Sequence, residues 1–242
     1  MEVPRLRMFA GPNGSGKSTI KSVIAPDLLG VYINADEVEQ QIRERNTLDL
    51  RPFGVRASQE EISAFFGAST LLRRAGLTSP ARSIQLRDES LHFGDVAANS
   101  YYASVVADFL RRKLLDAGAS LTFETVMSSP DKVEFLGSAQ ARGFRTYLYY
   151  IATGNPLVNV SRVRNRVRDG GHPVPEEKII SRYSRSLELL AAAIRVSHRA
   201  YIFDNSTRDK IWLAEVTDGR KLEMRTDQMP AWFKHYVWDR ME

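Results

Sequence analysis

The sequence contains no cysteine. This absence excludes disulfide bonds, thiolate metal sites and thiol catalysis, and it is typical of proteins in a reducing compartment. There is also no run of 18 apolar residues, so no segment can form a transmembrane helix. No apolar signal segment precedes the first predicted strand. We therefore expect a cytoplasmic protein with no membrane partner.

The chain also has no internal repeat, low-complexity stretch or linker-like segment that would indicate a second domain. At 242 residues and 43% hydrophobic it is long enough to bury a full core. These features predict a single domain over residues 1–242.

A modest excess of positive charge is present, with 34 basic against 29 acidic residues, and arginine dominates the basic set. This balance suits phosphorylated ligands and polyanions, although a compositional bias toward arginine explains it equally well. No stretch interleaves aromatic and basic residues as a stacking motif for single strands would. Nucleic acid is therefore not the expected partner.

The most informative segment is residues 11–18, which match the phosphate-loop signature G-x-x-x-x-G-K-[ST] in full. In such loops the glycines let backbone N–H groups turn inward around an anion, the lysine reaches the outer phosphates, and the last hydroxyl can ligate Mg²⁺. The loop predicts ATP or GTP as the cofactor, with Ser18 as the metal ligand. The predicted nucleotide-binding residues are Gly11, Asn13, Gly14, Ser15, Gly16, Lys17, Ser18 and Thr19.

The order of elements predicts the fold class. Residues 5–10 alternate as a strand, and residues 18–25 continue without glycine or proline as a helix would. Further strands and helices alternate along the chain. We expect an α/β fold of the P-loop NTPase type, with a doubly wound, mostly parallel sheet and helices on both faces. The other expected elements are strands at 30–34, 120–124, 145–151 and 200–203, helices at 36–45, 96–117, 131–142, 156–168 and 176–196, a hairpin at 210–225 and a short helix at 231–238.

Residues 47–95 fit this alternation poorly and are interpreted as an insertion, helical at 58–75 and weakly periodic to 95. The four aromatic residues of the final helix are expected in the core, because aromatics at helical spacing are more often buried than exposed to a partner.

Three carboxylates follow predicted strands: Asp36, Glu124 and Asp204. Asp36 could be a general base or only an N-cap of the next helix. Glu124 closes an apolar strand, where a carboxylate is costly unless it is paired or faces a wet site. Asp204 precedes Asn205, a pair that also suits an ordinary turn.

Residues 162–175 are rich in arginine and contain a Gly-Gly-His turn. Arg162 and Arg166 are four residues apart and share one helix face, whereas Arg164 lies on another. The segment is either a solvated charged surface or a lid over phosphates.

The phosphate loop, Ile33-Asn34-Ala35-Asp36, Phe123-Glu124-Thr125, the Gly-Gly-His turn, Arg182-Tyr183 and Asp204-Asn205-Ser206 together resemble the zeta toxin family. The resemblance runs in order over nearly the whole chain except residues 47–95. It implies a kinase that transfers the γ-phosphoryl group of ATP or GTP, with Mg²⁺, to a hydroxyl of a small molecule. In zeta toxins this acceptor is the 3′-hydroxyl of UDP-N-acetylglucosamine.

The resemblance also implies roles for individual residues. Asp36 would orient and deprotonate the acceptor hydroxyl, Glu124 with Thr125 would hold the acceptor, and Arg166 would stabilise the transferring phosphoryl group. His172 stands where toxins of the family tend to carry a second phosphate-contacting arginine. The implied catalytic residues are thus Lys17, Asp36 and Arg166, and the implied substrate-binding residues are Asp36, Glu124, Thr125, His172 and Arg182. Residues 47–95 lie between Asp36 and Glu124, so we expect them to bear on the choice of acceptor.

Three other function classes remain open from sequence. A mechanical or regulatory NTPase would use the same loop, but the chain lacks an Asn-Lys-x-Asp signature, a Leu-Ser-Gly-Gly-Gln signature and an apolar strand ending in Asp-Glu. A nucleic-acid or nucleotide kinase would fit the basic charge. A protein that acts through a partner, such as an antitoxin covering the nucleotide site, is the third possibility.

Overall fold

The computed structural model describes residues 3–21, 24–171 and 173–241. By the density of its internal contacts the chain separates into two units, Met1–Leu29 with Thr122–Glu242, and Gly30–Leu121. They are called the first and second units below.

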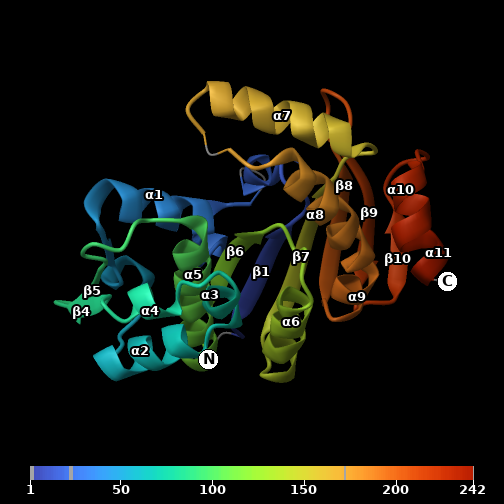
Figure 1. Cartoon of the computed structure of the whole chain (residues 1–242). Helices are drawn as coiled ribbons and strands as arrows, with labels where there is room; N and C mark the ends of the chain where they lie inside the picture. Colours follow the sequence, from blue (N-terminus) through green and yellow to red (C-terminus); the bar gives the residue numbers. More distant parts are fainter. Residues whose placement is uncertain (1–2, 22–23, 172, 242) are drawn as a thin grey trace. The chain divides into compact units, whose positions relative to one another are not determined.

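The main sheet has seven strands in the order β10-β9-β8-β7-β1-β6-β2 (Figure 1). β1 pairs in parallel with β7, and β7 with β8, whereas β8, β9 and β10 are antiparallel. The central strands are buried on both faces, as in a parallel sheet covered by helices; Leu6, Met8 and Phe9 of β1 are all 0% exposed, and Arg7 is 4% exposed. This confirms the predicted α/β class with a mostly parallel sheet. The strands are β1 (Arg5–Ala10), β2 (Val31–Ile33), β6 (Leu121–Thr125), β7 (Arg145–Ala152), β8 (Arg199–Asp204), β9 (Ile211–Thr217) and β10 (Lys221–Met224).

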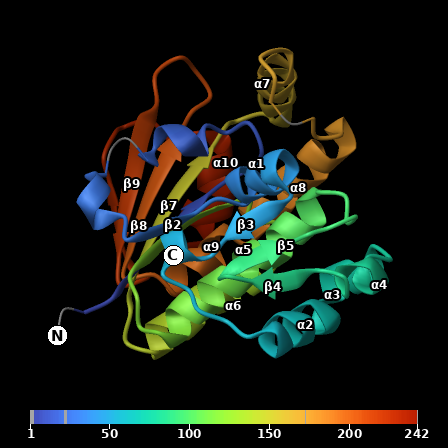
Figure 2. The ribbon, with the colours of Figure 1, turned by 90° about the vertical axis from the view of Figure 1, so that its left-hand side faces the viewer.

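Helices of the first unit begin and end close to their predicted bounds. α6 packs against β1 and β7, and α7 lies beyond the carboxyl ends of the first unit's strands (Figures 1 and 2). The helix predicted over 176–196 is interrupted at Leu189, where α8 ends and α9 begins. In the short C-terminal helices Trp232 and Phe233 are buried, which confirms the expected core role of these two. The helices are α6 (Asp131–Ala141), α7 (Pro156–Arg168), α8 (Glu176–Glu188), α9 (Leu190–Arg195), α10 (Ala231–Phe233) and α11 (Asp239–Met241).

The α-helix predicted directly after the phosphate loop differs from the observed structure. Where the structure describes this segment, the chain forms a 3₁₀ turn at Lys17–Thr19 and another at Pro26–Leu28; residues 22 and 23 lie outside the described residues. In an α-helix the carbonyl of Gly16 would accept from the N–H of Ile20. Instead it accepts from the hydroxyl of Thr19 at 2.8 Å, and the Ile20 N–H donates to Lys17 O at 2.9 Å. The threonine side chain thus competes with the backbone and tightens the turn.

The second unit is built on α1 (Ala35–Arg45) and α5 (Ser100–Asp116), which pack against each other. Its other elements lie in residues 47–95 and were only partly predicted. The expected helix over 58–75 is split at Ser69, whose hydroxyl caps a new helix by accepting from Leu72 N. These elements are β3 (Thr47–Asp49), α2 (Gln59–Ala68), α3 (Thr70–Arg74), α4 (Thr78–Ala81), β4 (Gln85–Arg87) and β5 (Ser90–His92).

A three-stranded sheet in the order β3-β5-β4 was missed by the sequence analysis. Each strand has only three residues, too few for alternation to be visible. The β4–β5 turn places Asp88 and Glu89 at φ 48° and 60°, the left-handed conformation of a tight hairpin. The segment is packed rather than peripheral within its unit, since Phe93 contacts the ring of Tyr102 on α5 and the Tyr102 hydroxyl donates to Leu77 O. None of the helices in the described part of the chain is long and apolar enough to cross a bilayer.

Candidate functional site

The glycines of the phosphate loop are fixed by close approach of other backbone and side-chain atoms. Gly11 has φ +146°, and a Cβ at this position would lie 2.0 Å from the carbonyl oxygen of Ile151. Gly16 has φ +96°, and its Cβ would lie 2.4 Å from Nδ2 of Asn205. At Gly11 both the dihedral and the backbone of Ile151 require glycine, and at Gly16 the positive φ favours glycine while the nearest atom belongs to the Asn205 side chain. The two signature glycines therefore fit the loop against β7 and the segment that follows β8.

Gly14 occupies a position that the signature leaves open, yet it is equally constrained. Its φ is +73°, and a Cβ would lie 2.6 Å from the carbonyl oxygen of Asn159 on α7. The phosphate loop and α7 are thus in direct backbone contact at this point. Such an approach is possible only for glycine.

The loop has the donors that a phosphate group requires. Within the described part of the chain the N–H groups of Gly14 and Gly16 donate to no protein acceptor. The hydroxyl of Ser15 is 0% exposed and has no hydrogen-bond partner. Unsatisfied buried polar groups are uncommon in folded proteins and usually await a ligand or water. The residues present therefore fit the phosphates of a nucleotide.

The cation of the loop is held by the loop itself. Lys17 Nζ donates to Gly11 O at 2.8 Å and to Pro12 O at 3.1 Å. Its ammonium group therefore already lies within the loop, where neutral carbonyls hold it. Phosphate oxygens would be stronger acceptors than these carbonyls, because both partners would then be charged.

The candidate metal ligand, Ser18, is exposed. Among the described residues no group of three or more histidine, aspartate and glutamate side chains could hold a metal. Magnesium commonly takes one or two protein ligands and completes its shell with phosphate oxygens and water. A single exposed hydroxyl beside the phosphate loop fits that ligand pattern.

Two asparagine amides hold the outside of the loop, and neither was predicted as a site residue. Asn159 on α7 is 0% exposed, and its Nδ2 donates to Asn13 O at 2.6 Å. Asn205, after β8, donates from Nδ2 to Ser15 O at 2.8 Å. The Thr153 hydroxyl donates to Oδ1 of Asn159 and so fixes which way that amide faces. The sequence signal was weak: an asparagine on the apolar side of a helix and an Asp-Asn-Ser turn.

Two more cations lie around this turn. Arg162 donates to Asn205 O at 2.7 Å and to Thr207 O at 3.2 Å. Lys210 Nζ donates to Thr19 O at 3.3 Å, and burial lowers the pKa of its ammonium group. Neither forms an ion pair with a carboxylate in the described part of the chain. The segment after β8 is therefore tied to the phosphate loop at both ends.

The predicted lid is a helix followed by a glycine turn. Arg166 is exposed on the last turns of α7, three helical positions after Val163. The backbone N–H of Gly171 donates to Arg166 O at 2.9 Å and closes the helix end. His172, which was predicted to contact substrate, lies outside the described residues.

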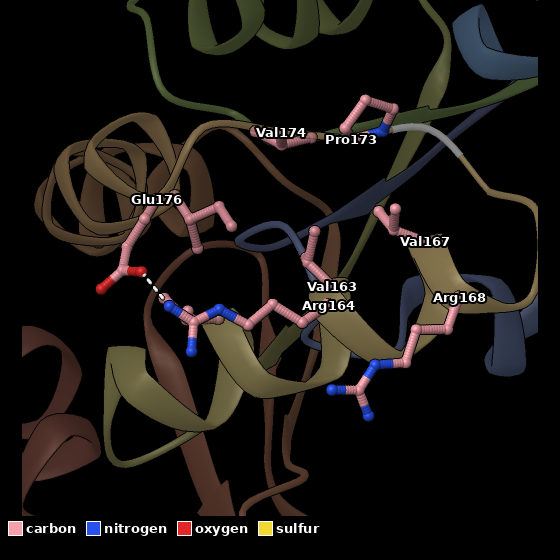
Figure 3. A pocket seen from close by; sticks show the side chains of 9 residues that line it. Val163, Arg164, Val167, Arg168, Pro173, Val174 and Glu176 are labelled. Atoms are coloured by element: carbon pink, nitrogen blue, oxygen red, sulfur yellow. Dashed lines mark hydrogen bonds and ion pairs between the residues drawn. The ribbon is translucent and has the colours of Figure 1, made fainter.

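Arg164 lies on another face of α7 and has a different environment. Its guanidinium donates to Glu176 on α8 at 2.6 Å, across a hollow of about 350 Å³ between the two helices (Figure 3). The hollow is lined mainly by apolar side chains, and Arg168 lies at its edge (Figure 3). Its lining residues are Val160, Val163, Arg164, Val167, Arg168, Pro173, Val174, Glu176 and Ile179. The faces that Arg164 and Arg166 occupy are therefore distinct, as their spacing predicts.

The proposed acceptor-binding residues of the first unit lie on β6 and α8. Glu124 and Thr125 are half-buried at the carboxyl end of β6, and the Thr125 hydroxyl accepts from Met127 N at 3.0 Å. Arg182 is half-buried on α8. Its neighbour Tyr183 donates to Thr153 O at 2.6 Å, and burial, helped by Tyr236 and Asp204, raises the pKa of the Tyr183 hydroxyl to about 12. The tyrosine thereby fixes α8 beside the segment that follows β7.

Asp36 belongs to the second unit. Its local structure rules out the interpretation of Asp36 as the N-cap of the next helix. The cap of α1 is Asn34, whose side chain accepts from Asp36 N at 2.9 Å. The Asp36 carboxylate is exposed and has no hydrogen-bond or ionic partner among the described residues. Asp36 is therefore not the capping side chain, which leaves its carboxylate available for another role.

Asp204 is a structural carboxylate. It is 3% exposed and accepts from the backbone N–H of Ser206 at 2.8 Å, from the Ser206 hydroxyl at 2.9 Å and from Trp232 Nε1 at 2.6 Å. The Ser206 hydroxyl also accepts from Gly154 N at 2.8 Å. The turn interpretation of Asp204-Asn205 is therefore correct, and the turn aims the Asn205 amide at the phosphate loop.

Comparison with solved structures shows the fold. The structure resembles AvrRxo1-ORF1 in its complex with AvrRxo1-ORF2 and sulphate ions, with a TM-score of 0.57, 14% identity and 92% of this chain covered. The chain spans 61% of the length of that protein. A second structure of the same complex, with ATP, has a TM-score of 0.53 and 13% identity, with the same shares of each chain covered. A structure of the PezAT chromosomal toxin-antitoxin system of Streptococcus pneumoniae has a TM-score of 0.54 and 15% identity, covering 98% of this chain and 80% of that one.

Sequence comparison identifies the family. An uncharacterized protein of Haemophilus influenzae (strain ATCC 51907 / DSM 11121 / KW20 / Rd) is 22% identical over 175 residues, which cover 72% of this chain and 89% of that protein. The family model described as zeta toxin matches residues 94–217, just over half of the chain. The matched region contains Glu124, the arginine helix α7 and the segment after β8, so the chain belongs to the zeta toxin family.

Proposed function

We propose that this protein is a kinase that transfers the γ-phosphoryl group of ATP or GTP to a hydroxyl group of a small molecule. The observation that carries the proposal is the phosphate loop, in which the N–H groups of Gly14 and Gly16 donate to no described protein acceptor and the Lys17 ammonium is held by Gly11 O and Pro12 O. Membership of the zeta toxin family supports phosphoryl transfer as the use of that loop. UDP-N-acetylglucosamine is the candidate acceptor that the family resemblance implies.

Phosphoryl transfer requires positioning and charge neutralisation rather than covalent catalysis. Different residues of the site would supply these two contributions. The loop N–H groups and Lys17 would bind the phosphates, and Arg166 would stabilise charge on the transferring group. Glu124, Thr125 and Arg182 would hold the acceptor, and Asp36 would accept the proton of its hydroxyl. Magnesium, held by Ser18 and the phosphates, would neutralise charge on the phosphate oxygens.

An antitoxin protein is the proposed partner. The support is indirect: the PezAT structure belongs to a toxin-antitoxin system, and this chain shares its fold. Co-expression with the product of a neighbouring gene, followed by size-exclusion chromatography, tests for a stable complex. Separate elution of the two proteins would contradict this part of the proposal.

The function is tested by a screen of acceptors with γ-labelled ATP and GTP in the presence of Mg²⁺. The panel holds UDP-N-acetylglucosamine, other sugar nucleotides, free sugars, nucleosides and a short oligonucleotide. We expect label on one class of small hydroxyl compound and none with the Lys17→Ala variant. Release of inorganic phosphate alone would favour an NTPase, and label on the oligonucleotide would favour a nucleic-acid kinase.

A further inference from the structure

The phosphate loop is held from outside by side chains that no signature motif contains. Asn159 comes from α7 and Asn205 from the segment after β8, and their amides reach two carbonyl oxygens of the loop, those of Asn13 and Ser15. Both contacts join segments more than 140 residues apart in the sequence. They are therefore features of the fold around the loop, and not of the loop sequence alone.

The geometry of the peptide bond links these contacts to phosphate binding. A carbonyl and the next residue's N–H belong to one planar trans unit and point in opposite directions. An amide that holds Asn13 O on the outside therefore directs the N–H of Gly14 inward. In the same way, the hold on Ser15 O directs the N–H of Gly16 inward. Neither of these two N–H groups donates to a protein acceptor within the described residues.

We propose that Asn159 and Asn205 are positioning residues that preorganise the phosphate loop, each fixing one inward N–H donor for a phosphate oxygen. The inference rests on the proposed function, because it concerns the phosphates of the nucleotide. Neither asparagine touches the ligand in this proposal; each acts through one peptide unit. Preorganised donors avoid the cost of ordering the loop when the anion binds.

Three further contacts support the arrangement. The Thr153 hydroxyl donates to Oδ1 of Asn159, so the amide cannot rotate to present its oxygen to the loop without losing that bond. Arg162 holds the backbone of Asn205 at 2.7 Å. At Gly14 and Gly16, added Cβ atoms would lie 2.6 Å from Asn159 O and 2.4 Å from Asn205 Nδ2. The absence of a side chain at both glycines thus leaves room for the two asparagines.

The same contact positions α7 relative to the loop. Asn159, Arg162 and Arg166 occupy positions i, i+3 and i+7 of one helix and so share a face. The bond from Asn159 to Asn13 O fixes the rotation of that face toward the loop. Loss of the bond should therefore reduce the contribution of Arg166 as well as the affinity for phosphate.

The test compares Asn159→Leu and Asn205→Leu with Asn165→Leu, a matched control on α7 whose exposed side chain makes no hydrogen bond within the described chain. The probe is inorganic triphosphate with Mg²⁺, measured by calorimetry beside ATP and GTP, and the melting temperature of each ligand-free variant is recorded. We expect each single variant to bind about three- to tenfold more weakly, the scale of one hydrogen bond, and the control to stay within about twofold. The two losses should combine nearly additively in the double variant, because the asparagines hold different peptide units.

A purely structural role would lower the melting temperature and leave the affinity of the folded protein unchanged, so unchanged affinity in folded variants overturns the inference. If Asn159→Leu does not fold, Asn205→Leu, at a half-buried loop position, and Thr153→Val, which frees the Asn159 amide, carry the same test. Loss of binding in Lys17→Ala with full binding in these variants would refute the positioning role alone. Absence of binding by the unaltered protein would refute the proposed function itself.

Discussion

Gly14 shows at the scale of one residue how this chain departs from the generic phosphate loop. The signature accepts any residue at this position, but here the backbone of Asn159 lies too close for a Cβ. A short contact between the loop and α7 is thereby possible, and the helix that carries the candidate arginines is attached to the loop that carries the phosphates. The sequence alone gives no reason to prefer glycine at this position.

The Lys17→Ala variant should lose most nucleotide affinity and all phosphoryl transfer. Its ammonium group is held inside the loop by two carbonyls, so its removal takes away the charge that faces the phosphates and leaves the surrounding fold intact. Calorimetry with ATP and a thermal melt check both parts. Lys221→Ala, at an exposed position of β10, is the control. Equal affinity in the Lys17 variant and the unaltered protein would contradict the assignment of the loop.

The Asp36→Asn variant should keep nucleotide affinity and lose phosphoryl transfer by roughly a hundredfold or more, the scale of a positioned general base. The structure supplies a sharp control, because Asn34 and not Asp36 caps α1. Asn34→Ala should lower the free energy of unfolding by about 1 kcal/mol and leave the rate of the folded protein unchanged. A normal rate in Asp36→Asn would remove this carboxylate from the mechanism.

At the scale of an element, α7 has two contacting faces. Val160 and Val163 are buried and pack with Ile179 of α8. Arg164 lines the same hollow between α7 and α8 and forms an ion pair with Glu176 of α8. Asn159 and Arg162 contact the phosphate loop and the turn after β8. The orientation of this charge-rich helix is therefore set by the partners of its polar residues as well as by its buried valines.

The Arg166→Ala variant should lower the catalytic rate far more than it raises the nucleotide KM, because an arginine on the transferring group acts chiefly in the transition state. Arg164→Ala is the matched control: it removes an exposed ion pair with Glu176, of the kind that contributes little to stability. Steady-state kinetics of both variants separate the two roles. Equal rate losses would indicate a diffuse basic surface in place of a specific contact.

At the scale of the whole molecule, the residues proposed for nucleotide binding lie in the first unit, while Asp36 and residues 47–95 lie in the second. We keep the prediction that residues 47–95 contribute to the choice of acceptor. Shortening the segment is a poor test, however, since Leu48, Leu91 and Phe93 are at most 1% exposed and form the interior of their unit. A point substitution within that interior is more informative.

The Phe93→Ala variant should cost about 3–5 kcal/mol of stability within the second unit, because a fully buried ring in contact with Tyr102 is removed. Nucleotide affinity should change by less than about twofold, since the hydrogen bonds described above for the loop lie within the first unit. Hydrogen exchange locates the loss of stability, and calorimetry measures the affinity. Leu71→Ala, at a side chain that is 39% exposed, is the control. An affinity loss as large as that of Lys17→Ala would show that the nucleotide site depends on the second unit.

Local patterns in the sequence were sufficient to predict the phosphate loop, the parallel strands and most helices of the first unit. Strand β1 and helix α7 begin and end where their patterns predict, because buried strands and amphipathic helices carry their periodicity in the residues themselves. The three-residue strands of residues 47–95 are too short for any such periodicity. In the 3₁₀ turn after the loop, Gly16 O accepts from both the backbone N–H and the hydroxyl of Thr19, and helix propensity does not anticipate this side-chain bond.

The sequence by itself determined the chemistry of the phosphate loop and the order of elements, since both depend on neighbouring residues. Only the tertiary structure decided which polar side chains support that chemistry. Asn159 and Asn205 lie far from the loop in the chain, and the hydrogen bonds that join them to it exist only once β7, α7 and β8 are packed together. The same holds for Asp204, whose three donors convert a candidate catalytic carboxylate into the anchor of a turn. A carboxylate or an amide has no fixed role until the fold sets which donors and acceptors surround it.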